Sequence, residues 1–211
     1  MMDRRAAQTI MDQSAGELLE RKISECIASK DWRKVINIGQ ASSFEERVKY
    51  LWVWPLEKDL EKIHACFSRF DINRLLSIGC GTGLLEWLIH SATGIHISGV
   101  ELDERWWRSK YATKTYIPLV FAETQCNVIQ GQPLWDSIMF CYFNNGPAFC
   151  EYMDNFNGKY VIIVGPRDGQ GIHTDPLPSR VNFPHGQYWE RCCEMQIGSE
   201  NLNCIVIYRR Q

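Results

Sequence analysis

The sequence has no apolar run that approaches the roughly 20 residues needed to cross a bilayer. Its first residues carry two arginines but no apolar segment of the kind that secretory signals contain. We therefore expect a soluble, cytoplasmic protein, with the nucleus as the alternative compartment, and no membrane partner.

The sequence also lacks an excess of charge of either sign. Its 23 basic and 25 acidic residues give a formal net charge of -2 at pH 7. Proteins that bind nucleic acid non-specifically depend on a strong basic field, which this balance does not supply. We therefore expect no bulk nucleic-acid binding.

Cysteine is present, but not in the patterns that indicate metal sites or disulfide frameworks. The nine cysteines are odd in number and scattered, with no CxxC spacing and no cluster of cysteine and histidine. We interpret them as reduced, mostly buried thiols and expect no metal site.

Residues 1–70 are predicted to form an N-terminal helical extension. A capping box at Ser14 and Glu17, followed by apolar residues at helical spacing, predicts a helix over about 15–29. A second helix is expected after Ser43, and a third after Pro55. The extension is expected to pack on the core and offers a surface for a protein partner.

Residues 71–211 alternate between short apolar strands and helices of about ten residues. This rhythm predicts a parallel sheet covered by helices on both faces. The last two strand-like runs, 187–198 and 201–210, are joined by a short polar turn and predict an antiparallel hairpin. The predicted fold class is α/β.

The stretch LLSIGCGTGLLEWLI, residues 75–89, places a strand, a glycine-rich turn and a helix in direct succession. This order brings backbone N–H groups and a helix N-terminus to the carboxyl edge of the sheet, where α/β folds bind ligands. The dinucleotide fingerprint G-x-G-x-x-G would need glycine at position 84, which is leucine, so NAD is disfavoured. A purely structural turn is the other alternative.

The stretch at 75–83 resembles the first motif of the class I S-adenosylmethionine-dependent methyltransferases, which commonly reads LDIGCGTG. The resemblance covers about residues 70–211 and implies a Rossmann-like sheet of seven strands, mostly parallel, with an antiparallel last strand. It also implies that S-adenosyl-L-methionine is the cofactor. The cofactor-binding residues that it implies are Ser77, Gly79, Cys80, Gly81, Thr82, Gly83, Glu101, Leu102 and Glu123.

Within this set, the resemblance places Glu101 on the ribose hydroxyls and Glu123 on the adenine amino group. For each glutamate, a solvated surface acid is the alternative. Ser77 departs from the family pattern, because the family often has an acid there that helps to bind the amino group of the cofactor. A serine offers only a neutral contact.

The methyl acceptor is expected beyond the fourth strand, at the segment CYFNNGPAF, where Asn144 and Asn145 offer uncharged amides. The alternative is a turn at Asn145 and Gly146 before a helix that begins near Pro147. The long loop that follows, 165–186, is rich in glycine and proline and is a candidate substrate lid, with His173 as a candidate catalytic group. A surface histidine is the alternative for His173.

Two pairs of tryptophans also admit two interpretations. One of Trp106 and Trp107 is a candidate cover for the adenine or ribose. Trp52 and Trp54 either attach the extension to the sheet, which we favour, or close over the cofactor.

The leading hypothesis is therefore an S-adenosyl-L-methionine-dependent methyltransferase that acts on a small-molecule or protein acceptor. The alternative is a catalytically inactive methyltransferase-like protein that serves as a binding scaffold or cofactor sensor.

Overall fold

The computed structural model describes residues 17–121, 129, 135–199 and 202–211. Seven strands form one sheet in the order β3-β2-β1-β4-β5-β7-β6. They are β1 (Arg74–Ile78), β2 (His96–Glu101), β3 (Leu119–Phe121), β4 (Ser137–Cys141), β5 (Tyr160–Pro166), β6 (Trp189–Ile197) and β7 (Asn203–Arg210). Strand β7 pairs antiparallel with both β5 and β6, so it runs against the other six. The prediction of a mostly parallel sheet with an antiparallel hairpin is confirmed.

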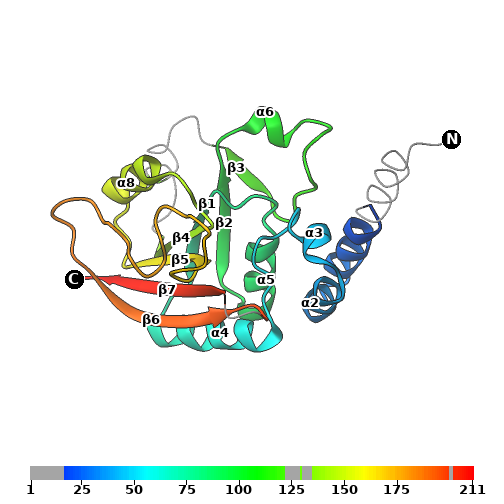
Figure 1. Ribbon diagram of the computed structural model, residues 1–211, viewed down its shortest axis with the longest axis horizontal. Coiled ribbons are helices and arrows are strands. Elements are labelled where there is room, and N and C mark those ends of the chain that lie inside the picture. The colour runs from blue at the N-terminus through cyan, green and yellow to red at the C-terminus, as the bar shows by residue number, and fades with distance from the viewer. Residues whose placement is uncertain (1–16, 122–128, 130–134, 200–201) are drawn as a thin grey trace.

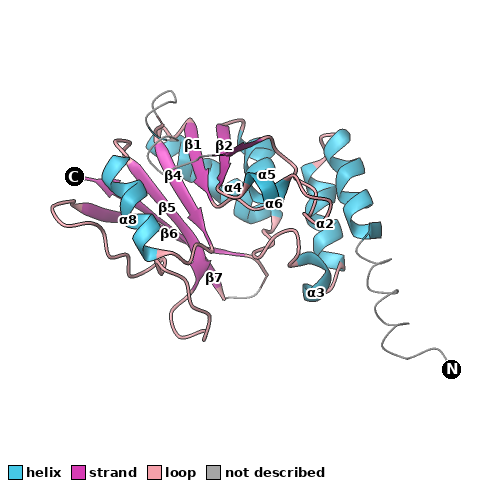
Figure 2. Cartoon of the chain, turned by 90° about the horizontal axis from the view of Figure 1, so that it is seen from above, coloured by secondary structure: helices cyan, strands magenta, loops and turns pink. Residues whose placement is uncertain are grey.

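Helices cover both faces of the sheet (Figures 1 and 2). Helices α4 (Glu57–Phe70) and α5 (Leu84–Thr93) lie on one face, and α8 (Gly146–Asn155) lies on the other. Successive strand residues face opposite sides, so Leu75 packs in the first core and Leu76 in the second. A sheet with both faces buried explains why its central strands are apolar throughout.

The N-terminal helices stand beside α5, at the end of the molecule away from α8 (Figure 1). They comprise a helical segment over 17–28, α2 (Trp32–Ala41) and the short α3 (Phe44–Arg47). Ile23 and Val35 are fully buried in the same core as Leu88 of α5. The extension therefore shares a continuous core with the α/β sheet.

Three details of the helices differ from the sequence prediction. Helix α2 was not predicted; Asp31 caps it, because its side chain accepts a hydrogen bond from the Lys34 amide. The helix after Ser43 spans only Phe44–Arg47, and α6 spans only Glu104–Trp107. Residues 48–52, which follow α3, line the cavity described below.

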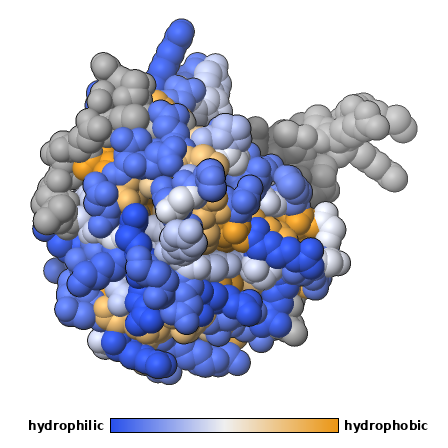
Figure 3. Space-filling view, turned by 90° about the vertical axis from the view of Figure 1, so that its left-hand side faces the viewer, coloured by the Kyte–Doolittle hydropathy of each residue, from blue (hydrophilic) through white to orange (hydrophobic). Residues whose placement is uncertain are grey.

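None of the described helices is both long and apolar enough to cross a bilayer. The end of the molecule near α8 shows a largely hydrophilic surface broken by smaller hydrophobic areas (Figure 3). The described cysteines are all free thiols, and each is buried or half-buried.

Candidate functional site

The strand order reverses between β1 and β4, because β2 lies on one side of β1 and β4 lies on the other. Open α/β sheets bind ligands in the crevice at the carboxyl ends of the strands where the order reverses. The glycine turn leaves β1 at this point, and Tyr142 leaves β4. The topology thus places the two segments next to the same crevice.

The glycine turn has a backbone that only glycine adopts readily. Gly79, Gly81 and Gly83 have φ values of 65°, 61° and 72°. A Cβ on Gly81 would meet nothing within 4 Å, so this residue borders open space, whereas a Cβ on Gly83 would lie 2.3 Å from Ile117. Gly81 therefore faces the crevice, while Gly83 begins α5 in a packed position.

A cavity of about 280 Å³ opens over the glycine turn. The turn and α5 form its floor, Trp107 contributes from α6, and Cys141 and Tyr142 contribute from the end of β4. Residues 48–52 of the N-terminal extension form the opposite wall. The extension thus belongs to the site.

Thr82 attaches the extension to the turn. Its hydroxyl donates a 2.6 Å hydrogen bond to the Tyr50 carbonyl and accepts one from the Leu84 amide. Thr82 is buried and lines the cavity. Its side chain therefore joins the wall and the floor of the cavity.

The most informative residue of the cavity is one that the sequence analysis missed. Glu86, in the first turn of α5, is 1% exposed and lines the cavity. Its Oε1 accepts a 2.6 Å hydrogen bond from Ser77 Oγ, whereas its Oε2 has no hydrogen-bond partner among the described residues. Burial, together with the nearby Glu101, raises the pKa of Glu86 to about 7, although the Ser77 hydrogen bond acts in the opposite direction.

A buried carboxylate oxygen without a partner is costly, so it indicates a group that pairs with a ligand. The sequence held one signal for it, an acid inside the apolar run Leu84–Ile89. Ser77 itself is fully buried, and its hydroxyl donates its hydrogen bond to Glu86. A buried acid therefore lies next to Ser77, on the helix that follows the glycine turn.

Glu101 lies where the resemblance expects it, at the end of β2. Its Oε1 accepts a 2.6 Å hydrogen bond from the Gly81 amide, so the carboxylate is held against the glycine turn. Leu102 is 52% exposed beside it. Glu123 lies outside the described residues, and its predicted role stays a prediction.

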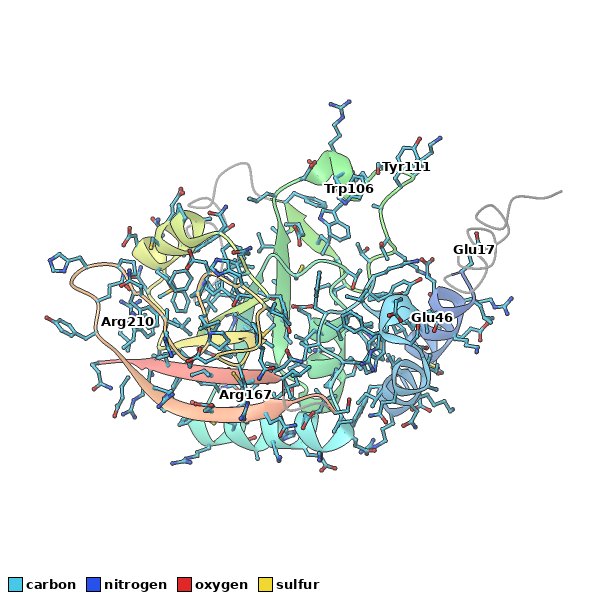
Figure 4. All side chains as sticks on the ribbon, in the orientation of Figure 1. Glu17, Glu46, Trp106, Tyr111, Arg167 and Arg210 are labelled. Atoms are coloured by element: carbon cyan, nitrogen blue, oxygen red, sulfur yellow. The ribbon has the colours of Figure 1, made fainter. Side chains whose placement is uncertain are left out.

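The two tryptophans of the next segment differ in exposure. Trp107 is half-buried and lines the cavity, whereas Trp106 is 49% exposed. Trp106 and Tyr111 lie on the α6 side of the molecule, away from β6 and β7 (Figure 4). Trp107 is therefore the better candidate to cover a ligand.

Trp52 and Trp54 also have separate roles. Trp54 is buried, and its indole N–H donates to the Ile36 carbonyl at 3.1 Å, so this hydrogen bond joins two segments within the extension. Trp52 is 59% exposed and stacks on Tyr142, with ring centroids 5.6 Å apart and planes at 19°. Trp52 lines the glycine-turn cavity, so its predicted role in covering a cofactor stays a prediction.

A second cavity of about 260 Å³ lies beyond the stacked pair, since Trp52 and Tyr142 line both cavities. Its other walls come from α3, the loop after β5 and the turn between β6 and β7. The Tyr142 hydroxyl donates to Asn203 Oδ1 of that turn. Burial raises the pKa of Tyr142 to about 12, so its hydroxyl stays protonated.

The three predicted catalytic residues are not among those that line either cavity. Asn145 caps α8 by accepting a hydrogen bond from the Ala148 amide at 3.1 Å, as the turn interpretation expects. Asn144 is exposed, and its neighbour Phe143 accepts a backbone hydrogen bond from Asp175. His173 is exposed, next to Ile172 of the second cavity.

The loop after β5 is held against the sheet along part of its length. The Asn145 amide donates to the Asp175 carbonyl, and the Tyr208 hydroxyl donates to the Pro178 carbonyl at 2.8 Å. Residues 168–173 form its exposed tip. A lid movement would therefore be limited to this tip.

Comparisons with known proteins agree with this architecture. No protein-family model and no curated protein match the chain. Among solved structures, an rRNA methylase from Escherichia coli aligns with 98% of this chain and 83% of its own, at 16% identity and a TM-score of 0.51. The chain has the fold of the class I S-adenosylmethionine-dependent methyltransferases.

Two further solved structures are similar to a smaller part of the chain. A SAM-dependent methyltransferase from Archaeoglobus fulgidus covers 71% of this chain and 94% of its own, at 16% identity and a TM-score of 0.38. Magnesium protoporphyrin IX methyltransferase from Synechocystis, with bound SAM, aligns with 73% of this chain and 79% of its own, at 12% identity and a TM-score of 0.43.

Proposed function

We propose that this protein is an S-adenosyl-L-methionine-dependent methyltransferase whose acceptor enters from the side of Trp52 and Tyr142. The observation that carries the proposal is the buried Glu86 carboxylate, which has one unpartnered oxygen and lines the cavity over the glycine turn. A ligand with an ammonium group would satisfy that oxygen. The methionine part of S-adenosyl-L-methionine has such a group.

Other residues in and beside the cavity fit the same cofactor; Glu101 does not line the cavity but contacts the glycine turn. Gly81 borders open space and lets a ligand approach the backbone, and the N-terminus of α5 favours a carboxylate. Glu101, held at the end of β2, can accept hydrogen bonds from a ribose diol. Trp107 offers an apolar face to the nucleoside.

The role of the protein in methyl transfer is alignment. Bound S-adenosyl-L-methionine supplies a methyl group on a sulfonium, which is open to in-line displacement. Glu86 and the glycine turn would fix the donor, and the Trp52–Tyr142 pair would fix the acceptor on the opposite side. Residues 48–52 of the extension wall the cavity and would shield a bound donor from part of the solvent.

Isothermal titration calorimetry of the purified protein with S-adenosyl-L-methionine tests the proposal. We expect binding that Glu101→Ala weakens by about 1 to 3 kcal/mol, the usual cost of losing hydrogen bonds to a charged group. NAD, as the control ligand, should not bind. Absence of S-adenosyl-L-methionine binding would refute the proposal, whereas binding without transfer to any acceptor would favour the scaffold or sensor.

A further inference from the structure

Three thiols lie together where helix α4 meets strand β6. Helix α4 lies along β6, which is the edge strand of the sheet (Figure 1). Cys66 of α4 and both Cys192 and Cys193 of β6 pack in or against the core on this face of the sheet. None of the three lines the glycine-turn cavity, so the cluster is separate from the site described above.

A β-bulge brings the two adjacent cysteines of β6 to the same core. Neighbouring residues of a regular strand point to opposite faces of a sheet. The pairing of β6 with β7 shifts between Arg191 and Cys193, so Cys192 is the additional residue of a bulge. Both Cys192 and Cys193 therefore pack against the core to which α4 belongs.

The two cysteines of the bulge have different partners. The Cys192 thiol donates to the Ile207 carbonyl of β7 at 3.3 Å, so it is bound to its own sheet. The sulfur of Cys193 instead accepts a hydrogen bond from the thiol of Cys66, with the two sulfurs 3.2 Å apart. In the part of the chain that the structure describes, this is the only hydrogen bond between two thiols.

The two sulfurs can form a bond after a small movement. The sulfurs of a disulfide lie about 2 Å apart, so these two need to approach by about 1 Å. Cys66 is held in place, because Ile63 and Phe67 of the same helix are buried. Strand β6 pairs with β7 alone and has a free outer edge, so we expect Cys193 to make the movement.

The two thiols differ in their access to solvent. Cys193 is half-buried, whereas Cys66 is 8% exposed. Burial raises the pKa of the Cys66 thiol, so Cys66 stays protonated at neutral pH. A small oxidant therefore meets Cys193 first, and Cys66 is the sulfur placed to react second.

We propose that Cys66 and Cys193 are a peroxide-sensitive thiol pair, which forms a disulfide between α4 and β6 and opens again under reduction. The proposal does not depend on the proposed methyl transfer, because neither residue lines the cofactor cavity.

The oxidation is a two-electron reaction with hydrogen peroxide. The Cys193 thiol loses its proton, and its sulfur attacks one peroxide oxygen. The O–O bond breaks, and the other oxygen leaves as hydroxide, which combines with that proton. The Cys66 sulfur then attacks the sulfur of the resulting sulfenic acid, whose hydroxyl leaves as water with the Cys66 proton. Both sulfurs are oxidised, and one peroxide is reduced to two waters.

The disulfide would fix the edge strand of the sheet to a helix of its core. The two cysteines are 127 positions apart, so the bond would close a long loop and restrict the unfolded chain. We therefore expect the midpoint of thermal unfolding to rise by about 5 °C or more in the oxidised protein.

Peptide mapping of the purified full chain tests the proposal. The reduced protein is treated with a small excess of hydrogen peroxide, and the remaining thiols are blocked with N-ethylmaleimide. Cleavage after lysine, arginine and glutamate gives the peptide 63–69, with Cys66, and the peptide 192–194, with both cysteines of the bulge. We expect mass spectrometry to show these two peptides linked, and dithiothreitol to separate them.

Cys192→Ala and Cys193→Ala are matched variants of adjacent half-buried thiols. We expect the link and the rise in unfolding temperature to persist in Cys192→Ala and to be lost in Cys193→Ala. Thermal melting of the reduced variants shows whether each is folded, and Cys66→Ala, which should also lose the link, provides the test if Cys193→Ala does not fold.

Three results would overturn the proposal. They are the absence of a link between the two peptides in the native protein, a link that requires Cys192 instead of Cys193, and an oxidised protein that unfolds at the temperature of the reduced one. None of these measurements uses S-adenosyl-L-methionine, so they leave the proposed function to its own test.

Discussion

Two strand-to-helix turns lie at the same edge of the sheet and differ in the free space beside their backbones. The turn from β1 to α5 has three glycines at positive φ, and a Cβ on Gly81 would meet nothing within 4 Å. The turn from β4 to α8 is filled, because a Cβ on Gly146 would lie 2.2 Å from Asp175 Oδ2 and Asn145 caps the helix. The first turn leaves open space beside its backbone, whereas the second turn is filled by Asp175 and by the cap of its own helix.

The largest expected effect comes from closing the open turn. Gly81→Val should weaken S-adenosyl-L-methionine binding by about 100-fold or more, because its side chain would enter the cavity from a backbone that disfavours it. The matched Gly146→Ala should instead lower the free energy of unfolding by about 1 to 3 kcal/mol through overpacking, with cofactor affinity unchanged. Calorimetry and denaturant titration measure the two quantities.

If Gly146→Ala reduced cofactor affinity as much as Gly81→Val, the contrast between the turns would be wrong. Gly81→Ala has a smaller side chain and should give an intermediate loss of cofactor affinity. It provides the test if the Gly81→Val variant does not fold.

The next largest effect is expected for Glu86→Gln. Losing the charge should weaken S-adenosyl-L-methionine binding by about 1.5 to 3 kcal/mol, the range for hydrogen bonds to charged groups. A glutamine retains the shape of the side chain, so the ligand-free protein should remain folded. Unchanged affinity would exclude Glu86 from the cofactor site.

Glu86→Gln also predicts a pH dependence of stability. The folded-state pKa of Glu86 is about 7, above its ordinary value of 4.5, so folding favours the protonated acid. The contribution of Glu86 is greatest below its ordinary pKa and is lost as the pH rises through about 7. Between about pH 5 and about pH 8, the ligand-free native protein should lose about 3 kcal/mol relative to Glu86→Gln.

Denaturant titrations of both proteins across this pH range measure that difference. A constant difference would mean that Glu86 is ionised in the folded protein at every pH in the range, against the effect of its burial. Saturating cofactor should reduce the loss in the native protein, because an ammonium partner favours the ionised carboxylate.

The smallest effects are expected at the filled turn. Asn145→Ala should lower the free energy of unfolding by about 1 kcal/mol, the usual cost of a lost helix cap, and leave cofactor affinity unchanged. Asn144→Ala, at an exposed position, should change stability by less than about 0.5 kcal/mol. A large loss of methyl transfer in Asn144→Ala with cofactor binding intact would support its predicted catalytic role.

The sequence predicted the open turn better than the filled one. Glycines directly after an apolar strand have one local explanation, a backbone at positive φ, and the order of strand, turn and helix then places them at the sheet edge. The segment around Asn145 allowed both a cap and an acceptor site, because an amide serves either purpose. Asn145 accepts a hydrogen bond from the Ala148 amide, which supports the interpretation as a helix cap.

Glu86 and Trp52 could not be assigned in the same way. An acid in an apolar helix becomes significant only when Ser77 and the cavity are known to face it. The stacking of Trp52 on Tyr142 joins residues far apart in the chain. Trp54, only two residues from Trp52, is instead buried against the helix that contains Ile36.

By itself, the sequence determined the alternation of strands and helices, the antiparallel hairpin and the position of the glycine turn. These features follow from local patterns of apolar residues and from the conformations that glycine allows. The tertiary structure decided that the extension walls the site, that Glu86 supplies the buried acid, and that Trp52 and Tyr142 separate two cavities. These features depend on contacts between distant segments, which no local pattern specifies.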